Sequence, residues 1–271
     1  MATVRLEDGT QVACIVRSEA LVLDQHVAGY FRHGISLRDE GTIIDVGANV
    51  GVFGVRVLQQ TSQARLVALE PVPPIHDMLA RNLEQFGAGR AEALCYGAAR
   101  QAGSFELTYF PRAPAMSTAH PERWTEHPDE LRKAVAGTLR NAQGRLRVAR
   151  LLPAACSGWV ARWLTAVAEP WTCALRPLGE LIDAHVEGVI SLLKVDCEGA
   201  ELETLQSIWP EQWSRIAQVV VEVHDEEGRL DTVCALLTQH GLTEQVVDTE
   251  EGLEETHLRN VYAHRSPASS S

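Results

Sequence analysis

The sequence has no apolar stretch long enough for a membrane span and no cysteine pattern of a metal or disulfide framework. No apolar run approaches the roughly 20 residues that a spanning helix needs. The opening MATVRLEDGT lacks the basic-then-apolar layout of a signal peptide. The six cysteines are scattered without a C-x-x-C pair, which is typical of reduced thiols. We therefore expect a cytoplasmic protein that has no membrane partner.

Positive charge is also scarce over most of the chain. There are 24 Lys and Arg against 36 Asp and Glu, and the formal net charge of −12 disfavours nucleic acid as a partner. Residues 111–165 are the exception, because nine Lys and Arg stand there against four Asp and Glu, a local charge of +5. This basic insert is either a docking surface for an acidic partner or the solvated face of surface helices.

The length of 271 residues, 45% of them hydrophobic, suits one large α/β domain that carries an insertion. Residues 111–171 hold six of the 12 prolines and are too long for an ordinary connection between strands. We expect a helical lid there, lying over the carboxyl ends of the strands, with helices at about 129–141 and 153–168. Trp159 and Trp163 lie one turn apart in the second helix, and we interpret them as the core of the lid rather than a platform for substrate.

The two ends of the chain flank this domain, which we place at 41–265. Residues 1–40 are predicted to form a cover of one short strand and one helix. His26 and Tyr30 of that helix are candidates to line a pocket, although a place in the core or on the surface is the simpler interpretation. Residues 266–271 have the composition of a disordered tail.

The chain is organised around GTIIDVGANVGVFG, residues 41–54. Its first part is a short apolar run, the pattern of a buried parallel strand. Three glycines then punctuate a turn that leads into a helical pattern over residues 52–60. Strand, glycine-rich turn and helix together form the nucleotide-binding start of a doubly wound sheet. With the later strand patterns, we expect an α/β sheet of about seven strands, mostly parallel, with an antiparallel last strand.

The spacing of the loop, D-x-G-x-N-x-G, favours a cationic ligand. Dinucleotide loops usually read G-x-G-x-x-G and bind a pyrophosphate, which a carboxylate at Asp45 would repel. S-adenosylmethionine has no phosphate and carries a sulfonium and an ammonium. Glu70 ends the next apolar run, where its carboxylate can accept hydrogen bonds from both ribose hydroxyls. In the simpler alternative, Gly47 and Gly51 are turn glycines and Asp45 is a helix cap.

Small and polar residues follow the later strands. Gly97 and Ala98 follow the third strand and would leave room for an adenine ring. The next two strands end in a set of ionisable residues: Asp196, Glu198, Glu222, His224 and Asp225. Clustered carboxylates are also the ligands that a hard divalent cation prefers, but we do not favour a metal site here.

At this point several motifs together resemble the FkbM-type methyltransferases: IIDVGANVGVFG, LEP, LLKVDCEGAELETL, VVVEVHD and NVYAHR. The resemblance covers about residues 43–265 and weakens in 111–171. It implies a class I methyltransferase fold, S-adenosylmethionine as cofactor, and O-methylation in natural-product or sugar pathways. The helix-rich insert is also similar to O-methyltransferase domains of polyketide synthase modules. Their substrate is a β-hydroxyacyl chain on an acyl carrier protein, which the basic insert would receive.

The resemblance also implies a set of site residues. The cofactor would lie on the loop, the acidic strand end and the small residues: Asp45, Gly47, Asn49, Gly51, Val52, Phe53, Glu70, Pro71, Gly97 and Ala98. The transfer would involve His224, Asp196 and Glu222. We expect His224 to be the base that takes the hydroxyl proton, because histidine titrates nearest neutrality. Two other function classes compete with this one: a nicotinamide-dependent oxidoreductase, and a non-catalytic module that keeps the cofactor fold.

Overall fold

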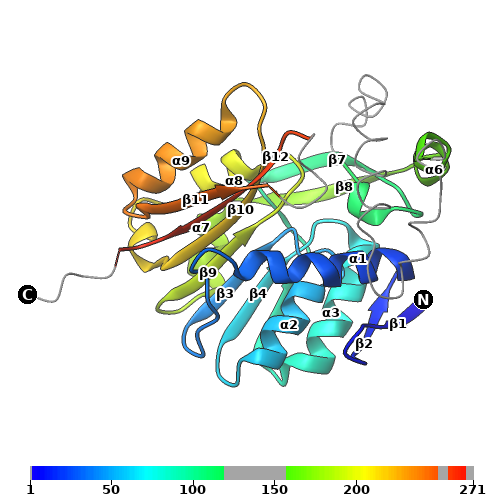
Figure 1. The fold of residues 1–271 in the computed structure, drawn as a ribbon, viewed down its shortest axis with the longest axis horizontal. Helices are drawn as coiled ribbons and strands as arrows, with labels where there is room; N and C mark the ends of the chain where they lie inside the picture. Colours follow the sequence, from blue (N-terminus) through cyan, green and yellow to red (C-terminus); the bar gives the residue numbers. More distant parts are fainter. Residues whose placement is uncertain (1, 119–156, 250–255, 267–271) are drawn as a thin grey trace, which may run out of the picture.

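A seven-stranded sheet forms the centre of the computed structural model, which describes residues 2–118, 157–249 and 256–266 (Figure 1). In spatial order its strands are β11 (Glu244–Asp248), β12 (Leu258–His264), β10 (Gln218–His224), β9 (Ile190–Val195), β3 (Thr42–Val46), β4 (Arg65–Leu69) and β5 (Ala91–Leu94). The last strand, β12, runs antiparallel to both of its neighbours, and the pairs from β10 to β5 are parallel. The predicted fold class is confirmed.

Helices cover both faces of this sheet, so its central strands are buried on both sides. Every residue of β3 and β9 is buried, as expected for parallel strands between two helical layers. Two hydrophobic clusters result, one on each face. The first packs against α1 (Arg17–Val27), α2 (Val52–Gln60) and α3 (Pro73–Gly87). The second packs against α7 (Leu178–His185), α8 (Glu201–Gln206) and α9 (Arg229–Gln239).

A smaller sheet of three strands stands beside the main one. Its order is β6 (Gly97–Ala98), β8 (Glu169–Arg176) and β7 (Gly103–Tyr109). Because β7 and β8 pair antiparallel from Gly103 opposite Leu175 to Tyr109 opposite Glu169, the long insertion leaves and returns along one two-stranded arm. The sequence did not predict β8, whose first residues we had assigned to the insertion, or the helix α7 that follows it.

The insertion itself is described only at its two ends. At one end, the short helix η2 (Pro114–Met116) follows β7, and at the other, α6 (Ser157–Leu164) covers part of the helix predicted for 153–168. The helix predicted for 129–141 lies outside the described residues, as does most of the basic insert. Trp159 and Trp163 are 71% and 48% exposed, so our interpretation of this pair as the core of the lid is wrong.

The N-terminal segment lies against α2 and α3. It consists of β1 (Ala2–Arg5), β2 (Gln11–Cys14), α1 and the 3-10 turn η1 (Ala28–Phe31). Arg56 of α2 donates to both oxygens of Asp24 in α1, at 2.7 and 2.9 Å.

A short helix η5 (Trp213–Arg215) precedes β10. In the described part of the chain, no helix is long and apolar enough to cross a membrane.

Among the described glycines, Gly47 is the one where an added Cβ would meet a neighbouring atom at the shortest distance. Its φ is +77°, and a Cβ there would lie 1.7 Å from the backbone oxygen of Asp196 at the end of β9. We predict that Gly47→Ala lowers the free energy of unfolding by about 3 kcal/mol or more, measured by denaturant unfolding. Gly89 is the matched control, because its φ is +80° but nothing lies within 4 Å of an added Cβ. Gly89→Ala should lower it by only about 1 kcal/mol, and equal losses would contradict the prediction.

Candidate active site

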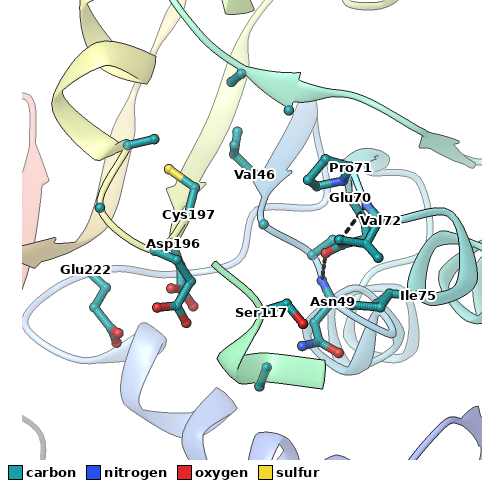
Figure 2. A pocket seen from close by; sticks show the side chains of 18 of the residues that line it. Val46, Asn49, Glu70, Pro71, Val72, Ile75, Ser117, Asp196, Cys197 and Glu222 are labelled. Carbon is teal, nitrogen blue, oxygen red and sulfur yellow. Dashed lines mark hydrogen bonds between the residues drawn. The ribbon is translucent and has the colours of Figure 1, made fainter. Parts of the chain in front are cut away.

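A cavity of about 650 Å³ opens at the carboxyl ends of the central strands, where ligands bind in doubly wound sheets (Figure 2). Most of the residues predicted for the site meet on its wall: Gly47, Asn49, Val52, Phe53, Glu70, Pro71, Gly97, Ala98, Asp196 and Glu222. Three predicted site residues do not line the cavity: Asp45, Gly51 and His224.

Glu70 is fixed in the wall by two backbone donors. Its Oε2 accepts a hydrogen bond from the amide of Asn49 at 3.1 Å, and its Oε1 accepts one from the amide of Val72 at 3.0 Å (Figure 2). Burial raises the pKa of Glu70 to about 7, although the two hydrogen bonds act in the opposite direction. The group is therefore close to half ionised at neutral pH, and its remaining lone pairs can accept hydrogen bonds from a ligand in the cavity.

Gly51 serves the packing of the loop rather than the cavity wall. Its φ is +82°, and a Cβ there would lie 2.6 Å from the Cδ1 atom of Leu79 in α3. The glycine thus lets the start of α2 approach α3 closely. The loop as a whole is held to β4, because the amides of Gly47 and Ala48 both donate to the carbonyl of Leu69, at 3.0 and 2.9 Å.

Asp45 is committed to an internal ion pair. Its side chain is fully buried, and its Oδ1 accepts a hydrogen bond from the ammonium of Lys194 at 2.9 Å. Our argument that Asp45 attracts a cationic ligand is therefore not supported by its position, because Lys194 already balances its charge. The sequence offered one signal for this pair, a lysine inside the largely apolar strand ISLLKV. It gave no indication of the partner, which lies 149 residues away.

Lys194 links several parts of the site. Burial opposes its charge, but the carboxylates of Asp45 and Asp196 outweigh this effect and raise the pKa of Lys194. Its ammonium lies 3.6 Å from Oδ2 of Asp196 and 5.0 Å from the ring centre of Tyr30. It also lines the cavity. We conclude that the site contains a permanent buried cation that the sequence interpretation missed.

Asp196 is a second carboxylate on the cavity wall. Its side chain remains 24% exposed on the cavity wall. The hydroxyl of Tyr30 donates to its Oδ2 at 3.0 Å. Figure 2 shows that Asp196 and Glu222 reach the same side of the cavity from neighbouring strands, away from Glu70. The cavity therefore has a carboxylate at each end, and the two ends differ in their partners.

His224 is not placed to act as the base that we predicted. Its side chain is 9% exposed, with Nδ1 3.1 Å from Oε1 of Glu201 and Nε2 3.5 Å from Oε2 of Glu198. Burial lowers the pKa of His224, but these two carboxylates outweigh it and raise the pKa to about 11. At neutral pH both ring nitrogens are protonated, so the imidazole has no lone pair with which to take a proton. The ring serves instead to hold two carboxylates beside the cavity.

Glu19, in α1, is a further cavity residue that the sequence analysis missed. Its carboxylate accepts a hydrogen bond from the amide of Ala115 at 2.9 Å, which joins α1 to the beginning of the insertion. Burial raises the pKa of Glu19 to about 8. No motif marked it, because its role depends on the contact between two segments far apart in the chain.

In the described residues, no group of three or more His, Cys, Asp or Glu side chains could hold a metal ion.

The chain is similar to known methyltransferases in sequence and in structure. The family model described as "Methyltransferase FkbM domain" matches residues 45–243, which include both carboxylate ends of the cavity. A methyltransferase FkbM from Methylobacillus flagellatus has a similar fold, with a TM-score of 0.51 at 14% identity. That comparison covers 87% of this chain and 46% of the other.

Three named relatives are similar to this chain in sequence. The 31-O-demethyl-FK506 methyltransferase FkbM of Streptomyces tacrolimicus is 31% identical over 268 residues, 97% of each chain. The AMB antimetabolite synthetase AmbE of Pseudomonas aeruginosa is also 31% identical, over 97% of this chain but only 12% of its own length. The methyltransferase sdnD of Sordaria araneosa is 34% identical over 73% of this chain and 72% of its own. The chain belongs to the FkbM family of methyltransferases.

Proposed function

We propose that this methyltransferase moves a methyl group from S-adenosylmethionine to a hydroxyl oxygen of a natural-product intermediate. The observation that carries the proposal is the pair of carboxylate ends in one cavity, Glu70 at one and Asp196 at the other. S-adenosylmethionine, when bound, supplies a methyl group that is activated by its sulfonium. The chain supplies the binding of the donor and a group that receives the proton of the acceptor.

The residues around Glu70 fit the adenosine part of the donor. The Glu70 carboxylate can accept hydrogen bonds from two ribose hydroxyls while its backbone donors keep it in place. Gly97 lets Leu175 pack closely, because a Cβ there would lie 2.8 Å from a side-chain carbon of Leu175 and 3.5 Å from Pro71. Gly97 and Ala98 both line the cavity, and both are small. We assign the adenine ring to this part of the wall.

Asp196 is the residue that we assign to the proton. Its partially exposed carboxylate can accept a hydrogen bond from the acceptor's O–H, which directs an oxygen lone pair toward the methyl group. As the new C–O bond forms, the bond between the methyl carbon and the donor sulfur breaks and S-adenosylhomocysteine is left, while the hydroxyl proton passes to Asp196 and from there to solvent. Glu222 lines the same end and can accept a hydrogen bond from a second hydroxyl of the acceptor. We assign no proton transfer to His224.

The source of the acceptor is a second part of the proposal. The name of one relative, 31-O-demethyl-FK506 methyltransferase, specifies transfer to oxygen in that protein. A second relative is a synthetase of which this chain corresponds to 12%, which supports delivery of the acceptor within a larger assembly. We therefore propose a β-hydroxyacyl chain carried by an acyl carrier protein, which meets the basic insert 111–165. A free small molecule or a sugar hydroxyl is the alternative.

The test of this function is transfer of a carbon-13-labelled methyl group. Panels of β-hydroxyacyl carrier proteins, the corresponding N-acetylcysteamine thioesters and free sugars are incubated with labelled S-adenosylmethionine, and products are analysed by mass spectrometry and NMR. We expect a methyl signal on oxygen, with faster turnover of the carrier-bound chain at low salt than at high salt. A label found only on nitrogen or carbon would contradict O-methylation. Equal salt dependence of carrier-bound and free acceptors would contradict carrier delivery.

Donor affinity should depend on pH through Glu70. The ionised carboxylate accepts hydrogen bonds from both ribose hydroxyls, whereas the protonated form has lost acceptor capacity. Because the pKa of Glu70 is raised to about 7, we expect the affinity for S-adenosylhomocysteine to fall as pH decreases through about 7. Calorimetry across this range measures it. Glu70→Gln should bind about tenfold more weakly at high pH and lack this step. An unchanged profile in Glu70→Gln would refute the assignment.

The protonation state of His224 is directly measurable. With its pKa raised to about 11, both ring nitrogens should carry hydrogen between about pH 6 and pH 9, as recorded by nitrogen-15 NMR of labelled histidines. His240 is an internal control in the same spectrum, because burial first and Arg265 second lower its pKa below the usual value. A His224 signal that titrates near the ordinary histidine pKa would restore it as a candidate base.

A further inference from the structure

The N-terminal segment contributes several side chains to the cavity wall, and one of them, Tyr30, reaches Asp196. It precedes the family match, which begins at residue 45. Tyr30 lies in η1, the turn after α1, and its hydroxyl donates to Oδ2 of Asp196 at 3.0 Å. The two residues are separated by 166 positions in the sequence. The cavity is thus lined by residues of the family domain and by residues of a segment outside the matched range.

The position of the Tyr30 ring is determined by neighbours on several elements. Its edge meets the ring of Phe53 in α2, with centroids 5.7 Å apart and an interplanar angle of 89°. Phe31 stacks on the same Phe53 ring at 5.6 Å and 17°. One residue before Tyr30, the carbonyl of Gly29 accepts a hydrogen bond from the hydroxyl of Tyr262 in β12 at 2.9 Å. The packing against Phe53 holds the Tyr30 ring, so its hydroxyl has little freedom to leave Asp196. The Tyr262 bond anchors only the backbone of the turn.

Lys194 acts on the same carboxylate oxygen as Tyr30. Its ammonium is 3.6 Å from Oδ2 of Asp196 and lies over the Tyr30 ring at 5.0 Å. A cation over an aromatic face is attracted by the ring. Lys194 therefore helps to hold both the Tyr30 ring and the Asp196 carboxylate in position. With Oδ2 engaged twice, the contacts described for Asp196 leave Oδ1 to meet an acceptor hydroxyl.

We propose that Tyr30 is a positioning residue for methyl transfer: through its hydrogen bond it orients Asp196 toward the acceptor, so that the N-terminal segment completes the active site. This inference rests on the proposed function, in which Asp196 receives the acceptor proton. Tyr30 itself takes no part in bond formation. Its contribution is the orientation of one carboxylate, which should affect turnover more than donor binding.

The chain offers a closely matched pair of variants. Tyr30→Phe keeps the ring contacts with Phe53 and Lys194 and removes only the hydroxyl that reaches Asp196. Tyr262→Phe removes a hydroxyl that anchors the same turn at Gly29 but does not reach Asp196. With β-hydroxybutyryl-N-acetylcysteamine as acceptor probe, we expect Tyr30→Phe to lower kcat about tenfold, as for loss of a hydrogen bond to a charged group. Its affinity for S-adenosylhomocysteine should stay within about twofold of wild type, and Tyr262→Phe should stay within about twofold in both measurements.

Combining Tyr30→Phe with Asp196→Asn tests whether Tyr30 acts through Asp196. Asp196→Asn alone should lower kcat on the order of 100-fold, as for loss of a general base. Adding Tyr30→Phe to that variant should then change kcat by less than about twofold, because the group that Tyr30 orients is already gone. A further tenfold loss, or equal kcat losses in Tyr30→Phe and Tyr262→Phe, would overturn the inference. If Asp196→Asn keeps the wild-type rate, or no hydroxyl acceptor is methylated, the proposed function itself fails.

Discussion

The buried ammonium of Lys194 is the charge around which the active site is assembled. Asp45 at the end of β3 and Asp196 after β9 bring two carboxylates to neighbouring strand ends, and Lys194 lies between them at 2.9 and 3.6 Å. Without it, the two negative charges would repel each other in a poorly solvated place. The same ammonium lies 3.5 Å from the carbonyl of Gly47, so the cofactor loop shares this anchor. Removing Lys194 would therefore disturb the loop and the Asp196 end of the cavity together.

The two ends of the cavity use carboxylates in different electrostatic settings. Glu70 has backbone amides as its partners, and burial raises its pKa to about 7. Asp196 has a cation and a tyrosine hydroxyl as its partners instead. His224 is a third case, because two neighbouring carboxylates raise the pKa of its ring and keep it as a cation. Environment, rather than residue type, assigns each group its task.

Sequence reasoning predicted the features that depend on local pattern and failed where distant partners decide. The strand–loop–helix unit and the position of Glu70 at a strand end could be predicted, because the periodicity and spacing that indicate them lie within 30 residues of chain. The pairing of Asp45 with Lys194 spans 149 positions, so the residue expected to face the ligand proved to be internal. His224 was assigned from its ordinary titration range, which two carboxylates in the fold alter. The strand β8 was missed because Pro170 suggested a loop, whereas its partner β7 lies far back in the sequence.

The central claim is that one cavity binds the donor at Glu70 and presents its methyl group toward Asp196. A crystal structure with S-adenosylhomocysteine tests it most directly. We predict both ribose hydroxyls within hydrogen-bond distance of the Glu70 carboxylate, the adenine beside Gly97 and Ala98, and the sulfur on the side of the cavity that faces Asp196. A complex in which the ribose contacts Asp196, or in which the ligand lies outside this cavity, would contradict the account.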